Sequence, residues 1–144
     1  MKNYRFLITK HARERFVERF TRESRQFAHL SRCRGCEICK ELAFKLYELV
    51  ETNKANWDKI ICAKLHDAED VKIFHNNSIF MDNMYAKYGY GRFRFLVEGI
   101  ILFPVSVEGC TNVVLTCMNV NNPTNGSMVI ADFVNRPKYK KLLI

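Results

Sequence analysis

Hydrophobic spacing divides the chain into a helical first part and a strand-forming second part. From about residue 9 to residue 52, apolar residues recur at intervals of three and four, the spacing that gives an α-helix one apolar face. The pattern predicts one helix that begins after Thr9, whose hydroxyl suits an N-cap, and continues to about residues 27–30. It predicts a second helix over Glu37–Thr52, followed by a polar connection over residues 53–70 that is interrupted by Trp57.

From residue 71 onward the pattern favours strands. Residues 71–74 and 78–82 flank a polar turn and suggest a hairpin, and residues 85–91 read as a loop rich in Tyr and Gly. Further strands are expected over residues 92–97, 100–107, 111–118 and 128–134, and a short one within residues 1–8. Pro104 suits an edge strand or a bulge better than a central strand. We therefore expect a single α+β domain over residues 1–144, with two N-terminal helices packed on one face of a small antiparallel sheet.

Length and composition agree with one folded domain. The chain has 144 residues, and single domains cluster at about 100–150 residues. No apolar run is long enough for a transmembrane helix, and the N-terminal residues lack the apolar stretch of a secretory signal. We expect a cytoplasmic protein without a membrane partner, whose six cysteines are reduced thiols or metal ligands.

Positive charge is concentrated near the N-terminus. The first 40 residues carry eleven Lys and Arg against four Glu, whereas the remaining 104 carry twelve basic and eleven acidic residues. A localised basic surface is typical of nucleic-acid binding, because each neutralised phosphate releases condensed counterions. An acidic protein or an anionic membrane would also be attracted, so the charge alone leaves these alternatives open.

One stretch of the first helix combines residue types and spacing that suit chemistry. His11, Arg15 and Arg19 follow one another every four residues and so lie in a row along one side of a helix. A neighbouring row is apolar and is made of Ala12, Phe16 and Phe20. A helix that buries the apolar row leaves one imidazole and two guanidiniums at its edge, an arrangement suited to binding a phosphate.

The same residues also have an ordinary structural interpretation. Histidines and arginines on a helix surface are often simply solvated. Glu14 and Glu18 lie within one turn of Arg15, Arg19 and Arg22, and could form surface ion pairs with them.

A row of cysteines follows the first helix. Cys33, Cys36 and Cys39 stand at three-residue intervals around a glycine, a spacing that lets thiolates surround a tetrahedral zinc ion. The fourth ligand would be His29 or a distant cysteine such as Cys62. An iron–sulfur cluster is a weaker interpretation, because Ala43 occupies the place of the next cysteine in the bacterial ferredoxin pattern.

The alternative to zinc is a set of buried thiols. If the segment is already helical, cysteines 36 and 39 belong to an apolar stripe with Ala43, Leu46 and Val50, in which cysteine acts as a small hydrophobe. In either case the site would be structural, since a closed shell of protein ligands leaves no position for a substrate.

The His11-Ala12-x-x-Arg15-x-x-x-Arg19 helix resembles the corresponding helix of two related groups. One is the RegB-type phage endoribonucleases, which cut early messenger RNA, and the other is a set of RelE-like toxin domains. Residues 93–99 and 111–118 resemble their later strands, whereas the cysteine row belongs to neither pattern. The resemblance implies a RelE-like fold, RNA as substrate and a catalytic His11. It leaves His29, His66 and His75 as alternatives for a second active-site histidine, and it implies a ribosome or an antitoxin protein as further partners.

We therefore expect a metal-independent endoribonuclease that acts in the cytoplasm, or in the host cytoplasm if it is encoded by a phage. Histidine suits the proton transfers because its ordinary pKa is about 6.5, and arginine supplies a permanent charge for the phosphate. His11 would be the general base or acid, with Arg15 and Arg19 on the scissile phosphate.

Tyr90, Arg92 and Arg94 would hold adjacent nucleotides by stacking and charge if their strand faces the helix. A solvated sheet face explains the two arginines equally well, and Tyr88 and Tyr90 also suit packing positions. The alternative function is a non-catalytic module that binds nucleic acid or protein, pinned by zinc at Cys33, Cys36 and Cys39.

Overall fold

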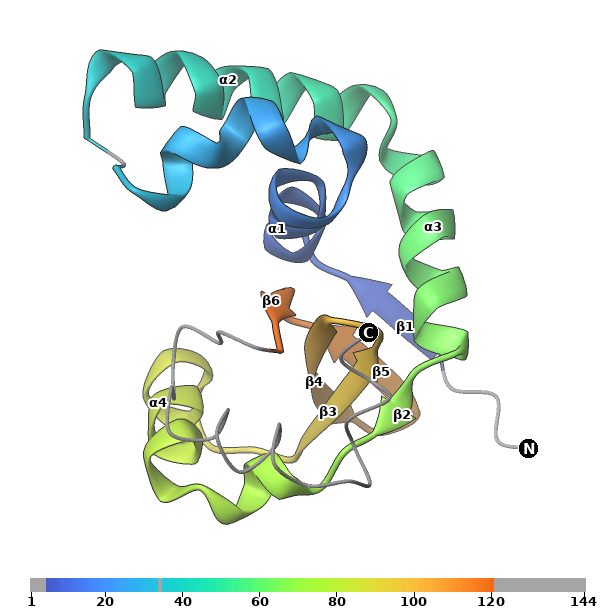
Figure 1. Cartoon of the computed structure of the whole chain (residues 1–144). Coiled ribbons are helices and arrows are strands. Elements are labelled where there is room, and N and C mark those ends of the chain that lie inside the picture. Colours follow the sequence, from blue (N-terminus) through green and yellow to red (C-terminus); the bar gives the residue numbers. More distant parts are fainter. Residues whose placement is uncertain (1–4, 34, 121–144) are drawn as a thin grey trace.

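The computed structural model describes residues 5–33 and 35–120, and its central element is a mixed β-sheet with helices on both faces (Figure 1). The α+β class is confirmed. The elements are, in chain order, β1 (Arg5–Ile8), α1 (Lys10–Phe20), η1 (Arg22–Ser31), α2 (Glu37–Thr52), α3 (Lys54–His66), β2 (Glu69–Asp70), η2 (Ile73–Asn76), α4 (Ser78–Tyr88), β3 (Phe93–Glu98), β4 (Ile101–Glu108), β5 (Thr111–Val114) and β6 (Met118–Asn119).

The sheet has the strand order β1-β5-β4-β3-β2, and β6 pairs with β4 beside the end of β5. Its pairs are antiparallel except that β1 runs parallel to β5. The expectation of a wholly antiparallel sheet was therefore wrong at this edge. The two strands lie far apart in the sequence, with every helix of the described residues between them, so no tight hairpin forces them to run in opposite directions.

Side chains of β3 alternate between two apolar cores, one on each face of the sheet. Phe93, Phe95 and Val97 pack with α4, whereas Leu96 lies in the core formed with α1 and α3. A third apolar cluster joins α1 and η1 to α2. Two helices do cover one face of the sheet, but they are α1 and α3 rather than the two N-terminal helices that we expected.

The polar connection expected over residues 53–70 is largely a helix, α3. Its apolar pattern is weak because Ile61 and Leu65 are its only fully buried side chains among the described residues. Trp57 is partly buried and donates a hydrogen bond from its indole Nε1 to the carbonyl of Leu49. This contact fixes the start of α3 against the end of α2.

The hairpin expected over residues 71–82 is replaced by the 3₁₀-helix η2 and by α4. Asn77 decides the outcome, because its side chain accepts a hydrogen bond from the backbone N–H of Phe80 and so caps α4. Gly89 ends the helix with a positive φ of 83°, a conformation that glycine adopts without a steric penalty. Short apolar runs fit either a strand or a helix, and here the cap selects the helix.

Helix α1 is shorter than we expected. Thr21 has an extended backbone after Phe20, and its hydroxyl accepts from the N–H of Glu23 and donates to the carbonyl of Val17. The chain therefore turns from α1 into η1 at this residue. Helix α2 has the predicted bounds, and the strand expected over residues 128–134 lies outside the described residues.

Pro104 lies in β4, a central strand, contrary to the expectation of an edge. Its carbonyl accepts from the N–H of Leu115, which lies between the end of β5 and the start of β6. The N–H and C=O of one residue point to the same side of an antiparallel strand, so the N–H that proline lacks would also point towards Leu115. At this position β4 lies between the residues that pair with β5 and those that pair with β6. The proline therefore removes no ladder hydrogen bond.

Thr9 joins α1 to the sheet through its side-chain hydroxyl, so loss of this hydroxyl should destabilise both the start of the helix and its attachment to the sheet. Its hydroxyl accepts from the N–H of Ala12 at 3.1 Å as an N-cap and donates to the carbonyl of Val114 at 2.9 Å. We expect Thr9→Ala to lower the free energy of unfolding by about 1–2 kcal/mol in a denaturant titration. Thr9→Ser keeps the hydroxyl and should lose much less. Equal losses in both variants would contradict this role.

Candidate phosphate site and candidate metal site

Helix α1 holds His11, Arg15 and Arg19 in one row, and all three side chains are partly buried. The neighbouring row is buried at Ala12 and Phe16, which pack in the core between α1, α3 and the sheet. Burial of this apolar row fixes the rotation of the helix. The imidazole and the two guanidiniums therefore lie along the edge of the apolar core, as the spacing indicates.

Glu18 lies between the two arginines and is only 4% exposed. One carboxylate oxygen is 2.8 Å from Nη1 of Arg15, and the other is 3.3 Å from Nε of Arg19. Arg19 also donates from Nη1 to the carbonyl of Cys117, in the segment between β5 and β6. The expected surface pairing of Glu18 is therefore a buried interaction that positions both guanidiniums.

The end of α4 contributes two further groups to this site. The positive charge of Lys87 acts on His11, and that of Arg15 acts on the phenol of Tyr88. The Tyr88 hydroxyl oxygen is buried and has no hydrogen-bond partner among the residues that the structure describes. Burial raises the pKa of Tyr88, so the phenol stays neutral and keeps a proton to donate.

His11 is the group whose ionisation the site changes most clearly. Burial lowers its pKa from 6.5 to about 4, and the positive charges of Arg15, Lys87 and Arg19 act in the same direction, while Glu18 opposes them. The imidazole is therefore neutral at neutral pH and able to accept a proton. An anion bound among these cations would raise this pKa again.

The other three histidines have different surroundings. His29 lies at the end of η1 beside Cys36. His66 makes an edge-on contact with the ring of Phe6 at the end of α3, and His75 packs on Phe95 from η2.

The three residues expected to bind nucleotides separate into two groups. Tyr90 is 90% exposed and stacks on Tyr85 with ring centroids 4.8 Å apart, and Arg92 is also exposed. Arg94 is partly buried instead. Its guanidinium donates from Nε to Asp70 at 3.0 Å and from Nη1 to Asn112 at 3.2 Å, which links β3 to β2 and β5.

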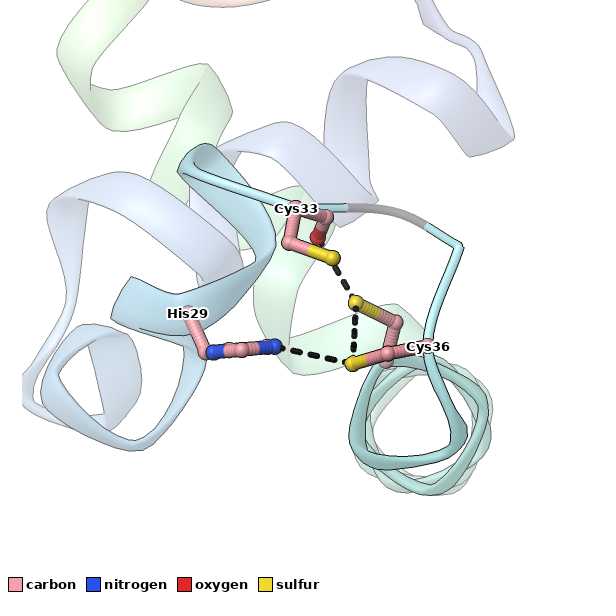
Figure 2. Close-up of side chains that lie close together, drawn as sticks. His29, Cys33 and Cys36 are labelled. Atoms are coloured by element: carbon pink, nitrogen blue, oxygen red, sulfur yellow. Dashed lines mark hydrogen bonds between the residues drawn. The ribbon is translucent and has the colours of Figure 1, made fainter.

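A second cluster of functional side chains lies where η1 meets α2. Figure 2 shows His29, Cys33 and Cys36 converging from the end of η1, the following loop and the start of α2. Nε2 of His29 is 3.1 Å from Sγ of Cys36, which is 3.4 Å from Sγ of Cys39. The four potential ligand atoms all lie within 4.8 Å of one another, so the cluster could hold a metal ion.

The structure decides between the two candidates for the fourth ligand. His29 completes the cluster, whereas Cys62 lies on α3 and packs against the core between α1 and the sheet. A hydrogen bond with the backbone of Gly35 lowers the pKa of the Cys33 thiol. A hydrogen bond with the backbone of Cys39 lowers the pKa of the Cys36 thiol in the same way. Cys39 is also a buried member of the apolar cluster with Leu46, so both interpretations of the cysteine row apply to it.

Sequence reasoning found the α1 row and the cysteines but missed Lys87 and interpreted Tyr88 as a packing residue. The signal that could have placed them was the Asn77 cap, which begins α4. Once α4 is read as a helix, residues 87 and 88 lie at its C-terminal end rather than in a loop.

No family model, curated protein or solved structure matches the chain. The resemblance to RegB-type and RelE-like nucleases therefore stays a prediction from the α1 residues. Among the helices of residues 5–33 and 35–120, none combines the length and apolarity needed to cross a membrane.

We expect the His11 ring to titrate with a midpoint of about 4 in the free protein when its C2 proton is followed by NMR. The unfolded chain takes up this proton first as the pH falls. The free energy of unfolding should therefore decrease between pH 6.5 and about 4, and His11→Gln should remove that part of the decrease. A midpoint for His11 near 6.5 would contradict the buried, cationic environment.

Proposed function

We propose that this protein is a metal-independent endoribonuclease whose active site joins the α1 row to the end of α4. The observation that supports this proposal best is a neutral, partly buried His11 under the positive charge of Arg15, Arg19 and Lys87. Groups that accept a proton and groups that bind an anion are thus together, as phosphodiester cleavage requires. The resemblance of the α1 residues to RNA-cutting enzymes supports RNA as the substrate.

In this proposal His11 removes the proton from a 2′-hydroxyl, and the 2′-oxygen attacks the adjacent phosphorus. A new bond forms between the 2′-oxygen and phosphorus, and the bond to the 5′-oxygen breaks. The products are a 2′,3′-cyclic phosphate and a 5′-hydroxyl, whose oxygen takes a proton from the leaving-group acid. We assign that role to Lys87, the ammonium of α4 whose charge acts on His11.

Arg15 and Arg19 stabilise the charge that develops on the phosphate, because guanidiniums donate to two oxygens and keep their charge. Glu18 holds both of them through hydrogen bonds, so little reorganisation is needed when the substrate binds. The bound phosphate also raises the pKa of His11 towards neutrality, where a general base is most effective.

We propose that the exposed ring of Tyr90 and the exposed Arg92 contact neighbouring nucleotides by stacking and charge. The ties of Arg94 to Asp70 and Asn112 favour a structural role for this residue. The resemblance suggests two biological settings in the cytoplasm. One is a phage protein that cuts messenger RNA in its host, and the other is a toxin that acts at the ribosome and is neutralised by an antitoxin.

A second candidate function is a zinc-stabilised module that binds nucleic acid without cutting it. The His29 and cysteine cluster favours it, together with exposed Arg22, Arg25 and Arg32 on η1 and at its end. Such a module would bind RNA with strong salt dependence and release no product.

The deciding experiment is a cleavage assay on mixed cellular RNA in EDTA, with a parallel reaction that lacks the chelator. We expect fragments that end in a 2′,3′-cyclic phosphate. His11→Ala should slow their formation by about 100-fold or more, and Arg15→Ala by about 100- to 1000-fold. His66→Ala, which removes an exposed histidine of α3 whose ring contacts Phe6, is the matched control and should cleave normally, which would also rule out His66 as a second active-site histidine.

The outcomes separate the two candidate functions. A substrate with 2′-deoxyribose at the cleavage position should stay intact, because it lacks the attacking hydroxyl. Intact RNA with salt-sensitive binding by both the wild-type protein and His11→Ala would favour the binding module. Cleavage that persists in His11→Ala would contradict the proposed active site.

A further inference from the structure

We propose that His29, Cys33, Cys36 and Cys39 bind one zinc ion, which clamps the end of η1 to the start of α2. The ion has a structural role that is separate from the proposed chemistry at His11.

The geometry of the cluster is close to that of a tetrahedral zinc site. Zinc–sulfur and zinc–nitrogen bonds of about 2.3 and 2.0–2.1 Å place tetrahedral ligand atoms about 3.6–3.8 Å apart. The sulfurs of Cys36 and Cys39 are 3.4 Å apart, and the nitrogen of His29 is 3.1 Å from the sulfur of Cys36. Since all four ligand atoms lie within 4.8 Å of one another, shifts of about an ångström or less complete the tetrahedron.

The ligand types select zinc among the common protein metals. Three thiolates and one imidazole are a soft donor set that forms closed tetrahedral zinc sites, whereas magnesium and calcium prefer oxygen ligands. A disulfide would use two of the three sulfurs and leave one thiol and the imidazole without a common partner. With four protein ligands the ion has no open position, so its role is structural.

The local backbone explains what the ion stabilises. Element η1 is a 3₁₀-helix of 10 residues, and such helices are rarely longer than 3–4 residues because their hydrogen bonds are poorly aligned. Its side chains Phe27 and Leu30 pack on α2, and His29 lies between them in sequence. Cys36 is the N-cap residue of α2, and its sulfur lies 3.1 Å from Nε2 of His29 and 3.4 Å from the sulfur of Cys39, so it faces the other ligands of the cluster.

The clamp also supports the helix that carries the proposed active site. Val17 of α1 packs in the same apolar cluster as Cys39, Phe27 and Leu46. Loss of the ion would loosen η1 against α2 and so remove part of the surface against which α1 packs. We therefore expect metal loss to lower the thermal stability of the whole protein.

The first test measures the metal content of the full-length protein, purified without added metal, by elemental mass spectrometry. We expect one zinc per chain. Cobalt added to metal-free protein should give the intense visible absorption of tetrahedral cobalt and its thiolate charge-transfer band in the near ultraviolet. Cys36→Ser and His29→Ala should lose most of the bound zinc and melt several degrees lower.

Cys62→Ser is the matched control, because it removes a partly buried thiol outside the cluster, and it should keep its zinc. His11→Ala should also keep its zinc, so failure of the nuclease proposal leaves this one standing. A folded wild-type protein without zinc, in which three thiols of the cluster react freely, would overturn the proposal. Zinc retained by Cys36→Ser but lost from Cys62→Ser would overturn it as well.

Discussion

Helix α1 is shared by two apolar cores, and the rest of the described structure depends on this double packing. Phe16 lies in the core between α1, α3 and the sheet, while its neighbour Val17 lies in the cluster that α1 forms with η1 and α2. Buried Arg13 adds a polar tie, since it donates to Asp58 of α3 at 2.6 Å and to the carbonyl of Ile8 at 3.0 Å. The helix is therefore held on both sides and can neither rotate nor slide without disrupting one core.

The side of α1 that belongs to neither core carries His11, Arg15 and Arg19, so the position of these three residues follows from the packing of the helix in the two cores. Placing two guanidiniums and an imidazole beside a core is unfavourable unless a counter-charge is present. Glu18 supplies it, and its two oxygens set the spacing of the arginines. The same low-dielectric surroundings that disfavour charge on His11 would strengthen its interaction with a bound phosphate.

Sequence patterns were reliable where one physical signal dominated. The α2 bounds and the row on α1 follow from helical spacing, and the cysteine interval brought three ligands of the candidate metal site together. His29 could not be chosen over Cys62 from the sequence, because the choice depends on how η1 folds back on α2.

The patterns failed where apolar runs were short or where contacts between distant segments decided the structure. Helix α4 has few buried residues, and its first half was interpreted as a strand of a hairpin and its second half, which contains Lys87, as a loop. The parallel pairing of β1 with β5 joins the two ends of the described chain, and no local signal reports it. Pro104 was expected at an edge strand or a bulge but lies in the central strand β4, because the break between β5 and β6 that accommodates it appears only in three dimensions.

The most direct test of the central claim, that α1 and the end of α4 together bind the RNA phosphate, is NMR mapping with a 2′-O-methyl RNA oligonucleotide that cannot be cleaved. We predict that signals of His11, Arg15, Arg19 and Lys87 shift together on binding, and that the titration midpoint of His11 rises from about 4. Shifts confined to η1 and α2, with α1 and α4 unchanged and the His11 midpoint unmoved, would contradict it.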